Sequence, residues 1–228
     1  MSEDFRKDEQ TFYRSLALER FEWLEHGFGT RRSDGAWAGR GAVTLRQVHS
    51  AIAVLASGAP GCAGTGDALY TNQPGLLLMV RTADCLPVLL ADGRRMAVAA
   101  IHAGWRGAVR GVVTATLHAM ARSFGSDPRD VRAAIGPGIG GCCFEVGTEV
   151  AGLFQPFFPE RTDLAERTTI DLQECVSRQL VAAGLQAENI SRASLCTACL
   201  KDDFHSWRRD WNPNARMDSL IGIRRPEK

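Results

Sequence analysis

Three continuous apolar runs in the middle of the chain are the clearest signal in its hydrophobic pattern. They are LLLMV (76–80), LPVLL (86–90) and MAVAAIH (96–102). Each run is too short to cross a membrane and lacks the apolar/polar alternation of a half-exposed strand. The pattern therefore predicts three strands buried on both faces. Shorter runs predict further strands in 42–50, 51–56 and 131–135.

The hydrophobic period changes to that of a helix beyond these runs. Apolar or small side chains recur at helical spacing from Val109 to Met120, which predicts an amphipathic helix over 107–122. A second helix is expected over about 171–183, with Asp171 as its N-cap. A short helix is expected at 147–155. The Gly- and Pro-rich segment 57–67 predicts a loop.

These elements predict an α+β fold in which mixed, buried β-sheets are flanked by helices. The chain has 228 residues, of which 45% are hydrophobic, so it can bury one sizeable core. No composition shift or linker divides it. We expect an N-terminal arm or peripheral helix over 1–20 and a single domain over 21–228.

Net charge and cysteine count indicate which kinds of partner the protein binds and in which cell compartment it lies. A net charge of +1 offers no basic face for a nucleic-acid backbone. The first residues lack the apolar stretch of a secretory signal, and no segment has the apolar length of a membrane span. Seven cysteines, an odd count, suit a reducing cytosol better than a disulfide framework. We expect a cytoplasmic monomer that binds neither nucleic acid nor membrane.

Three residues far apart in the sequence suggest one metal site. His49, Cys85 and His102 each lie at the edge of a predicted strand. Two imidazoles and one thiolate suit zinc, and three protein ligands leave the fourth position open, as in catalytic zinc sites. Their spacing matches no zinc finger. The same residues also allow a metal-free thiol hydrolase, with Cys85 as nucleophile, His102 as base and Asp84 orienting the imidazole.

The sequences around these residues are distinctive. They are GDALYTNQPGLLLMVRTADCLPVLLAD (66–92), VAAIHAGWRG (98–107), GPGIGGCCFEVG (136–147) and CTACLKDDFHSWRRD (196–210). In this order they resemble the laccase-domain proteins, also called peptidoglycan editing factors or zinc-dependent purine nucleoside phosphorylases. The resemblance runs from about His26 to Ile223.

The resemblance implies a function as well as a fold. It implies zinc held by His49, Cys85 and His102, phosphorolysis of purine nucleosides (adenosine, inosine, guanosine or methylthioadenosine), and adenosine deamination as a second activity. Catalytic roles are expected for Asp84, Cys85 and Arg106. Alternatives are a peptidoglycan-editing hydrolase with a Cys/His site, a copper-dependent polyphenol oxidase, and a non-enzymatic zinc-stabilised binding module. A multicopper centre needs more imidazoles than five histidines supply, although copper can replace a single zinc.

Arginines and glycines suggest where a nucleoside and phosphate bind. Arg106 is expected to open the helix after HAGWRG and to bind phosphate there. Arg208 and Arg209 are further phosphate candidates. GPGIGG (136–141) matches the glycine pattern of a dinucleotide-binding motif. That motif requires a helix next, whereas the residues that follow, CCFEV, predict an extended segment. We therefore expect a tight turn around Gly138 that lines a pocket.

Four further cysteines belong to two short motifs. Cys142 and Cys143 are adjacent, and we interpret both as small packing residues. Cys196 and Cys199 have CxxC spacing, but a zinc site needs a second pair of ligands. We therefore favour a strand end that leads into a helix.

Overall fold

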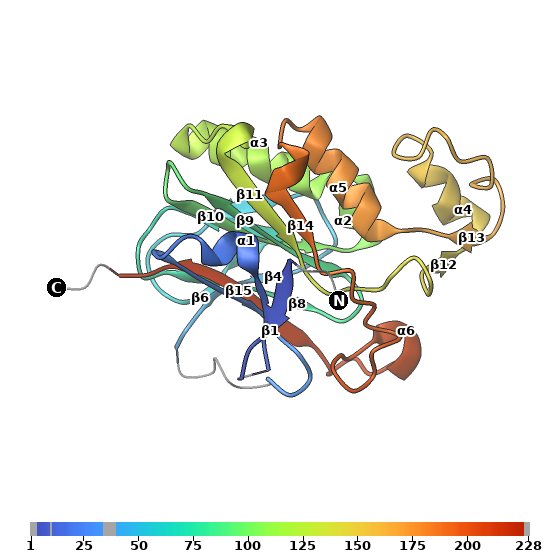
Figure 1. Cartoon of the computed structure of the whole chain (residues 1–228), viewed down its shortest axis with the longest axis horizontal. Helices are drawn as coiled ribbons and strands as arrows, with labels where there is room; N and C mark the ends of the chain where they lie inside the picture. Colours follow the sequence, from blue (N-terminus) through green and yellow to red (C-terminus); the bar gives the residue numbers. More distant parts are fainter. Residues whose placement is uncertain (1–3, 10, 34–39, 226–228) are drawn as a thin grey trace.

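The buried strands form two sheets that pack face to face, and the longer helices lie on the outer side of one of them (Figure 1). The computed structural model describes residues 4–9, 11–33 and 40–225. The first sheet has the order β1 (Phe5–Lys7), β2 (Tyr13–Ser15), β3 (Leu24–Phe28), β15 (Met217–Ile223), β8 (Leu77–Thr82), β4 (Val43–Arg46), β6 (Gly61–Thr65). The second has the order β14 (Ile190–Arg192), β11 (Val131–Ile135), β9 (Leu86–Asp92), β10 (Ala97–Ala103), β7 (Ala68–Thr71), β5 (Ala53–Leu55).

Both sheets mix parallel and antiparallel pairs. The β9–β10 and β10–β7 pairs at the centre of the second sheet are antiparallel, whereas β5–β7 and β11–β14 are parallel. In the first sheet β4 runs parallel to both β6 and β8. A separate ribbon pairs β12 (Glu145–Val146) with β13 (Thr168–Thr169). The predicted α+β fold with mixed buried sheets is confirmed.

Of the six helices in the described residues, α2 (Trp105–Val109), α3 (Val112–Phe124) and α5 (Leu172–Ala182) form a third layer on the second sheet (Figure 1). The other three are α1 (Leu16–Glu19), α4 (Thr148–Ala151) and α6 (Trp207–Asp210), with 3₁₀ turns at Pro128–Asp130, Gly152–Phe154 and Ala187–Asn189. Helix α3 packs on β10 and β7, and α2 and α5 pack beside it. Asp171 caps α5 as predicted, since its side chain accepts a hydrogen bond from the Glu174 N–H.

The continuous apolar runs are explained by burial on both faces. Along β10, Ala97, Ala99 and Ile101 pack into the core under the helices. The alternate residues Val98 and Ala100 pack into the core between the two sheets. Successive side chains of a strand point to opposite faces, so a strand between two cores needs apolar residues at every position.

The N-terminal segment differs from the arm or peripheral helix expected for residues 1–20. Of these residues, 4–9 and 11–20 are described, and they add β1, β2 and the short helix α1 to the fold. Phe5, Phe12 and Tyr13 are buried, and the backbone N–H of Ser15 donates to Nε2 of His26 at 2.9 Å. Each of the two strands has only three residues and buries one or two of them, so the hydrophobic pattern is too short to recognise in the sequence.

Three other expectations need correction. The loop predicted for 57–67 contains the edge strand β6, whose side chains are exposed, so no hydrophobic pattern marks it. The helix predicted over 107–122 is two helices, because Gly111 adopts a left-handed φ of 76° between α2 and α3. Cys196–Cys199 form a turn that does not lead into a helix.

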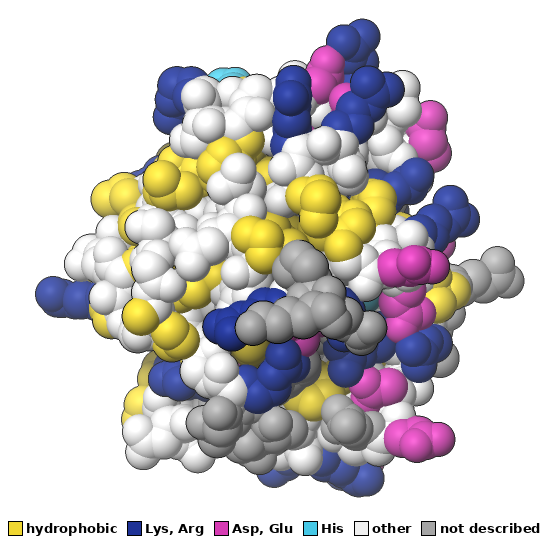
Figure 2. Space-filling view, turned by 90° about the vertical axis from the view of Figure 1, so that its left-hand side faces the viewer, with side chains coloured by type: hydrophobic (Ala, Val, Ile, Leu, Met, Phe, Trp, Pro, Cys, Tyr) yellow, Lys and Arg dark blue, Asp and Glu magenta, His cyan; other side chains and the backbone are white. Residues whose placement is uncertain are grey.

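Two features of the surface and the helices can be described. On the right-hand side of the face shown in Figure 2, acidic and basic side chains lie next to one another. Among the described residues, no helix has both the length and the apolar character needed to cross a membrane.

Candidate active site

The register of the central strands brings two of the predicted ligands together. Strands β9 and β10 pair Leu86 with Ala103. Cys85, which precedes Leu86, therefore lies beside His102 at one end of the second sheet. His49 reaches the same place from the loop between β4 and β5.

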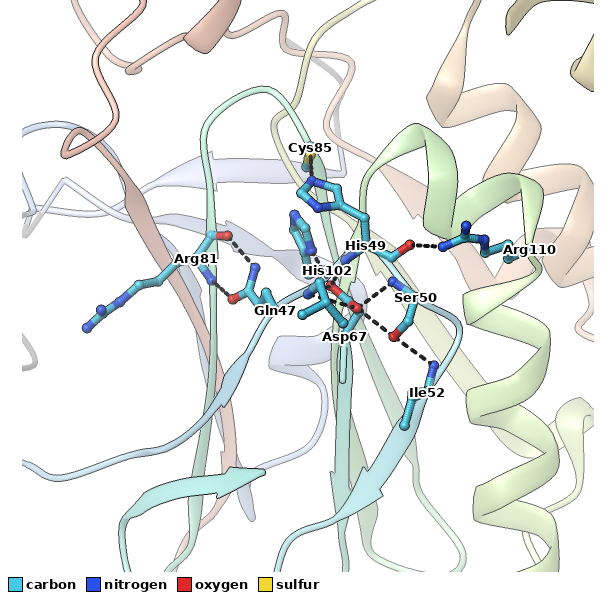
Figure 3. A network of polar contacts seen from close by, with 10 residues as sticks. Gln47, His49, Ser50, Ile52, Asp67, Arg81, Cys85, His102 and Arg110 are labelled. Atoms are coloured by element: carbon cyan, nitrogen blue, oxygen red, sulfur yellow. Dashed lines mark hydrogen bonds and ion pairs between the residues drawn. The ribbon is translucent and has the colours of Figure 1, made fainter. Parts of the chain in front are cut away.

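The three side chains converge as the sequence predicted. The Cys85 Sγ lies 3.8 Å from His49 Nε2, and the two imidazole centroids are 4.8 Å apart (Figure 3). One ligand atom from each of His49, Cys85 and His102 lies within 4.8 Å of the others. The described residues offer no acidic or histidine side chain as a fourth member of this group. The arrangement can hold one metal ion with a coordination position left open.

Asp67 organises this group, although sequence reasoning did not single it out. Its carboxylate lies 2.8 Å from His102 Nδ1 and accepts the backbone N–H groups of His49 at 2.9 Å and Ser50 at 2.6 Å (Figure 3). A carboxylate behind a ligating imidazole fixes the orientation of the ring and leaves the other nitrogen for the metal. The sequence signal was a single Gly-Asp pair before a strand, which many loops contain.

The electrostatics of the group favour a thiolate. Burial alone raises the pKa of Cys85, but hydrogen bonds with His102 and His49 outweigh it and lower that pKa to about 6. Burial alone lowers the pKa of His102, but hydrogen bonds with Asp67 and Cys85 raise it to about 9. A metal ion would take the place of the proton shared among these groups, since it needs a thiolate and neutral imidazoles.

Gly104, in HAGWRG, leaves the space that the three side chains occupy. A Cβ at this position would lie 2.8 Å from Cys85 Sγ and 2.8 Å from His49 Cδ2. His49 itself has a φ of 58°, which is unfavourable for a residue other than glycine. Strain of this kind persists where the surroundings hold a residue in place, here by the Asp67 carboxylate and by Arg110, which donates to the His49 carbonyl at 2.9 Å. The donor set, its carboxylate support and the room around it all fit zinc.

A pocket of about 540 Å³ opens over this group. Such a volume suits a small-molecule ligand. Its walls include the aromatic rings of Trp105, Phe144 and Trp207. Its basic lining residues are Arg81, Arg106, Arg208 and Arg216.

Asp84 occupies a supporting position. Its carboxylate accepts hydrogen bonds from the hydroxyls of Thr197 at 2.6 Å and Ser206 at 3.1 Å, and from the Arg208 N–H at 2.6 Å. The expectation that Asp84 orients the imidazole of His102 is wrong, because Asp67 takes that place. Asp84 instead ties the loop of Cys85 to α6, and its φ of 82° marks a strained turn.

The two arginines of α6 have different surroundings. Arg208 lines the pocket, yet its guanidinium donates to the carbonyls of Cys143 at 3.1 Å and Glu145 at 3.0 Å. Arg209 is not among the pocket-lining residues, and it pairs with Asp210 and donates to the Thr197 carbonyl at 2.9 Å. These contacts give both residues a role in holding loops.

The tight turn expected around Gly138 is not there: Gly138 forms an isolated parallel bridge with Cys196, and the turn begins at Gly141. The Gly138 N–H donates to the Leu195 carbonyl at 3.3 Å and its carbonyl accepts from Thr197 N–H at 3.0 Å. A Cβ there would lie 2.3 Å from a methyl group of Leu86. The neighbouring Ile139 lines the pocket, whereas substrate contact by Gly138 stays a prediction.

Arg106 projects from a shorter helix than expected. Helix α2 has only five residues, so Arg106 does not open the long helix α3. Its guanidinium lies 4.2 Å from the centroid of the Trp105 ring. No hydrogen bond or ion pair joins it to another described residue, so it is available to a ligand in the pocket.

Comparison with known proteins identifies the family. A family model described as multi-copper polyphenol oxidoreductase laccase matches residues 31–224. The chain belongs to this laccase-like family. Solved structures of Bacillus licheniformis YfiH and Geobacillus stearothermophilus YlmD share its fold, with TM-scores of 0.87 and 0.88, each 26% identical and covering 98% of this chain and 100% of theirs.

Curated relatives of this laccase-like chain carry the names of enzymes acting on nucleosides. A purine nucleoside phosphorylase of Bacteroides thetaiotaomicron is 43% identical over 163 residues, which are 69% of this chain and 60% of the relative. The purine nucleoside phosphorylase YfiH of Escherichia coli is 35% identical over 185 residues, 79% of this chain and 73% of the relative. Adenosine deaminase RL5, from an unknown prokaryote, is 39% identical over 149 residues, 63% of this chain and 56% of the relative. The match thus spans less than two thirds of two of these relatives.

The family description names several copper ions, and the positions of the histidines show how many metal ions imidazole groups could bind. His49 and His102 are the two histidines in the candidate metal group. His26 is buried beside Ser15, and His118 is exposed on α3. The described residues therefore provide one mononuclear site with imidazole ligands, as the histidine count indicated.

Proposed function

We propose that this chain is a zinc-dependent purine nucleoside phosphorylase that also deaminates adenosine. The observation that carries the proposal is the group of His49, Cys85 and His102 at a pocket lined by aromatic rings and arginines. The names of the relatives supply the reaction class. The substrates would be purine nucleosides, namely adenosine, inosine, guanosine or methylthioadenosine, together with phosphate.

The pocket residues have separate tasks under this proposal. The rings of Trp105, Phe144 and Trp207 offer apolar faces on which a purine can stack. Arg106 offers a guanidinium group for the phosphate, which must be held in line with the sugar carbon that it attacks. Arg81 also lines the pocket, but its Nε already donates to Asp218 at 3.2 Å. Zinc bound by the three ligands would supply a Lewis acid and would activate water for deamination.

The chain's own residues prepare that metal site. Asp67 holds His102 in one orientation through Nδ1, so that the opposite nitrogen faces Cys85 and His49. The side chain of Gln47 and the backbone of Arg81 exchange two hydrogen bonds, of 2.8 and 2.9 Å, which fix one rim of the pocket (Figure 3). The site is therefore held by packed strands and paired loops before substrate arrives.

One incubation tests the reaction class. Protein with defined zinc content is given adenosine and phosphate without oxygen, and the products are separated by chromatography. Adenine reports phosphorolysis, inosine reports deamination, and hypoxanthine reports both steps in sequence. Absence of all three products with zinc-loaded protein would overturn the proposal.

A variant at Arg106 separates phosphate binding from deamination. We expect Arg106→Ala to raise the phosphate concentration needed for half-maximal phosphorolysis by about tenfold to a hundredfold, since one charge-assisted contact contributes roughly 1.5–3 kcal/mol. Deamination, which needs only water, should stay near the wild-type rate. Arg122→Ala, on the exposed surface of α3, is the matched control. Equal loss of both activities would show that Arg106 instead maintains the pocket.

The two alternative activities make different predictions in the same assay. A thiol hydrolase built on Cys85 would keep its activity after zinc is removed by a chelator. A polyphenol oxidase would need copper and oxygen, both of which the anaerobic zinc-loaded protein lacks. Nucleoside turnover that requires zinc and no oxygen is therefore specific to the proposal.

A further inference from the structure

A second group of metal-type side chains lies apart from the candidate active site. Cys142 and Cys143 come from the turn after β11, and Cys196 and Cys199 from the turn after β14. The four sulfurs all lie within 4.8 Å of one another. Cys142 and Cys143, interpreted from the sequence as packing residues, therefore lie where a second pair of sulfur ligands for Cys196 and Cys199 would have to be.

Three of the sulfurs are spaced like corners of a tetrahedron around one ion, and the fourth, Cys196 Sγ, lies within 4.8 Å of each of them. Cys142 Sγ lies 3.7 Å from both Cys143 Sγ and Cys199 Sγ, and the last two are 3.4 Å apart. Zinc–sulfur bonds of about 2.3 Å in tetrahedral geometry place neighbouring sulfurs about 3.8 Å apart. In a multi-iron cluster at least two of the four thiolates bind different iron atoms and lie farther apart than the 4.8 Å that encloses all four sulfurs here. The geometry therefore favours a mononuclear site.

Disulfides do not explain this arrangement. All four cysteines are free, and a disulfide would bring two sulfurs to about 2.05 Å. Cys142, Cys143 and Cys199 are each close to the other two, so the sulfurs form a cluster in which no pair stands alone. Four thiolates at this distance would repel one another, and a bound cation removes that repulsion.

The surrounding backbone is arranged for sulfur ligands. The N–H of Gly140 donates to Cys196 Sγ at 3.2 Å, a contact that stabilises a thiolate. A Cβ on Gly140 would lie 3.1 Å from Cys196 Cβ and 3.3 Å from Cys142 Sγ, so glycine allows the two turns to approach.

We propose that Cys142, Cys143, Cys196 and Cys199 bind one zinc ion in a second, structural site. Four protein ligands close the coordination shell, in contrast to the three at the candidate active site. This site is independent of the nucleoside reaction proposed above, and its presence is measured by metal content and spectroscopy, without an activity assay.

The second zinc would fasten one wall of the pocket. Phe144 follows Cys143 and lines the pocket together with Arg208. Arg208 binds the carbonyls on the Cys143 side, whereas Arg209 donates to the carbonyls of Thr197 at 2.9 Å and Ala198 at 3.0 Å, between the other two cysteines. The arginines of α6 thus brace both cysteine turns, and the metal would join the turns directly.

Metal analysis of matched variants tests the proposal. Wild-type protein, purified under reducing conditions, is expected to carry two zinc ions per chain, and Cys85→Ala and Cys199→Ser one each. The double variant should carry none. Cys62→Ser, at an exposed cysteine outside both groups, should keep two. One zinc in the wild type that Cys85→Ala abolishes and Cys199→Ser leaves intact would overturn the proposal.

Spectroscopy on Cys85→Ala guards against misfolding of the cysteine variants, because this protein keeps all four cysteines of the cluster. X-ray absorption at the zinc edge should show four sulfur neighbours at about 2.3 Å, and cobalt substitution should give the thiolate charge-transfer bands of a tetrahedral site. Iron in place of zinc, nitrogen or oxygen neighbours, or paired disulfides without metal would each refute the assignment.

Discussion

Replacing Gly104 by alanine should remove the metal from the candidate active site while leaving the fold intact. The new Cβ would lie 2.8 Å from Cys85 Sγ and from His49 Cδ2, and 3.4 Å from His49 Nε2. Non-bonded carbon contacts normally start near about 3.5 Å, so one or both ligands must move by about 0.7 Å. Metal–ligand distances tolerate only about 0.2 Å. The displacement is therefore several times larger than coordination allows.

The backbone at Gly104 gives no reason for a loss of folding. Its φ of −72° and ψ of 166° are ordinary for alanine. A compatible Gly→Ala change even stabilises by about 0.4–1 kcal/mol through the unfolded chain. We expect Gly104→Ala to keep a cooperative thermal melt. It should bind zinc at this site at least about a hundredfold more weakly than the wild type, because loss of one residue that supports a metal ligand already weakens binding by up to about a hundredfold.

The assay is a zinc competition titration with a chromophoric chelator, read beside Cys85→Ala. If the four-cysteine site also holds zinc, Gly104→Ala should lose the same single ion that Cys85→Ala loses. Gly152→Ala is the control, because its φ of −59° suits alanine and the nearest atom to a new Cβ is 4.0 Å away. Wild-type zinc affinity in Gly104→Ala would refute the reasoning about this site.

Two further predictions concern Asp67 and His26. Asp67→Asn should weaken zinc binding by about tenfold to a hundredfold, since it replaces the carboxylate that accepts from His102 Nδ1. Unchanged zinc affinity in the same titration would show that Asp67 only holds the backbone of the His49 loop and does not support His102. Burial, aided by nearby arginines, lowers the pKa of His26 to about 3. As the pH falls, the unfolded chain therefore binds the proton before the folded protein does, and the free energy of unfolding decreases from about pH 6.5 downward. Between pH 6.5 and 5 the free energy of unfolding should fall by about 1.6 kcal/mol, and His26→Gln, which keeps an acceptor for the Ser15 N–H, should remove that loss. The same pH dependence of the free energy of unfolding in both proteins, measured by urea titration, would contradict this.

The fold class could be predicted because the strongest signals were long and unambiguous. Each of the three apolar runs is buried on both faces, β9 and β10 between the two large clusters and β8 between one of these and a smaller cluster around Phe12, which is why all three strands were recognised. The helix α5 was marked by both its period and its cap at Asp171. Short or exposed elements, such as β1, β2 and β6, bury too few side chains to leave a pattern.

The convergence of the predicted ligands could be anticipated in part. Cys85 and His102 flank strands that pair with each other, so their proximity follows from an antiparallel connection between neighbouring runs. The placement of His49 depended on the resemblance of its surroundings to a known family. The supporting residues Asp67 and Gly104 were missed, because what marks them is the space and the hydrogen bonds around the ligands.

The sequence by itself determined which strands are buried, which residue types can bind a metal and which family the chain resembles, since these follow from local composition and order. Only the tertiary structure decided that Asp67 rather than Asp84 supports His102, that Arg209 braces a loop, and that Cys142 and Cys143 meet Cys196 and Cys199. The physical reason is that such contacts join segments more than fifty residues apart in the case of the cysteines. Strand register and loop geometry set those distances, and neither is written in the spacing of residues along the chain.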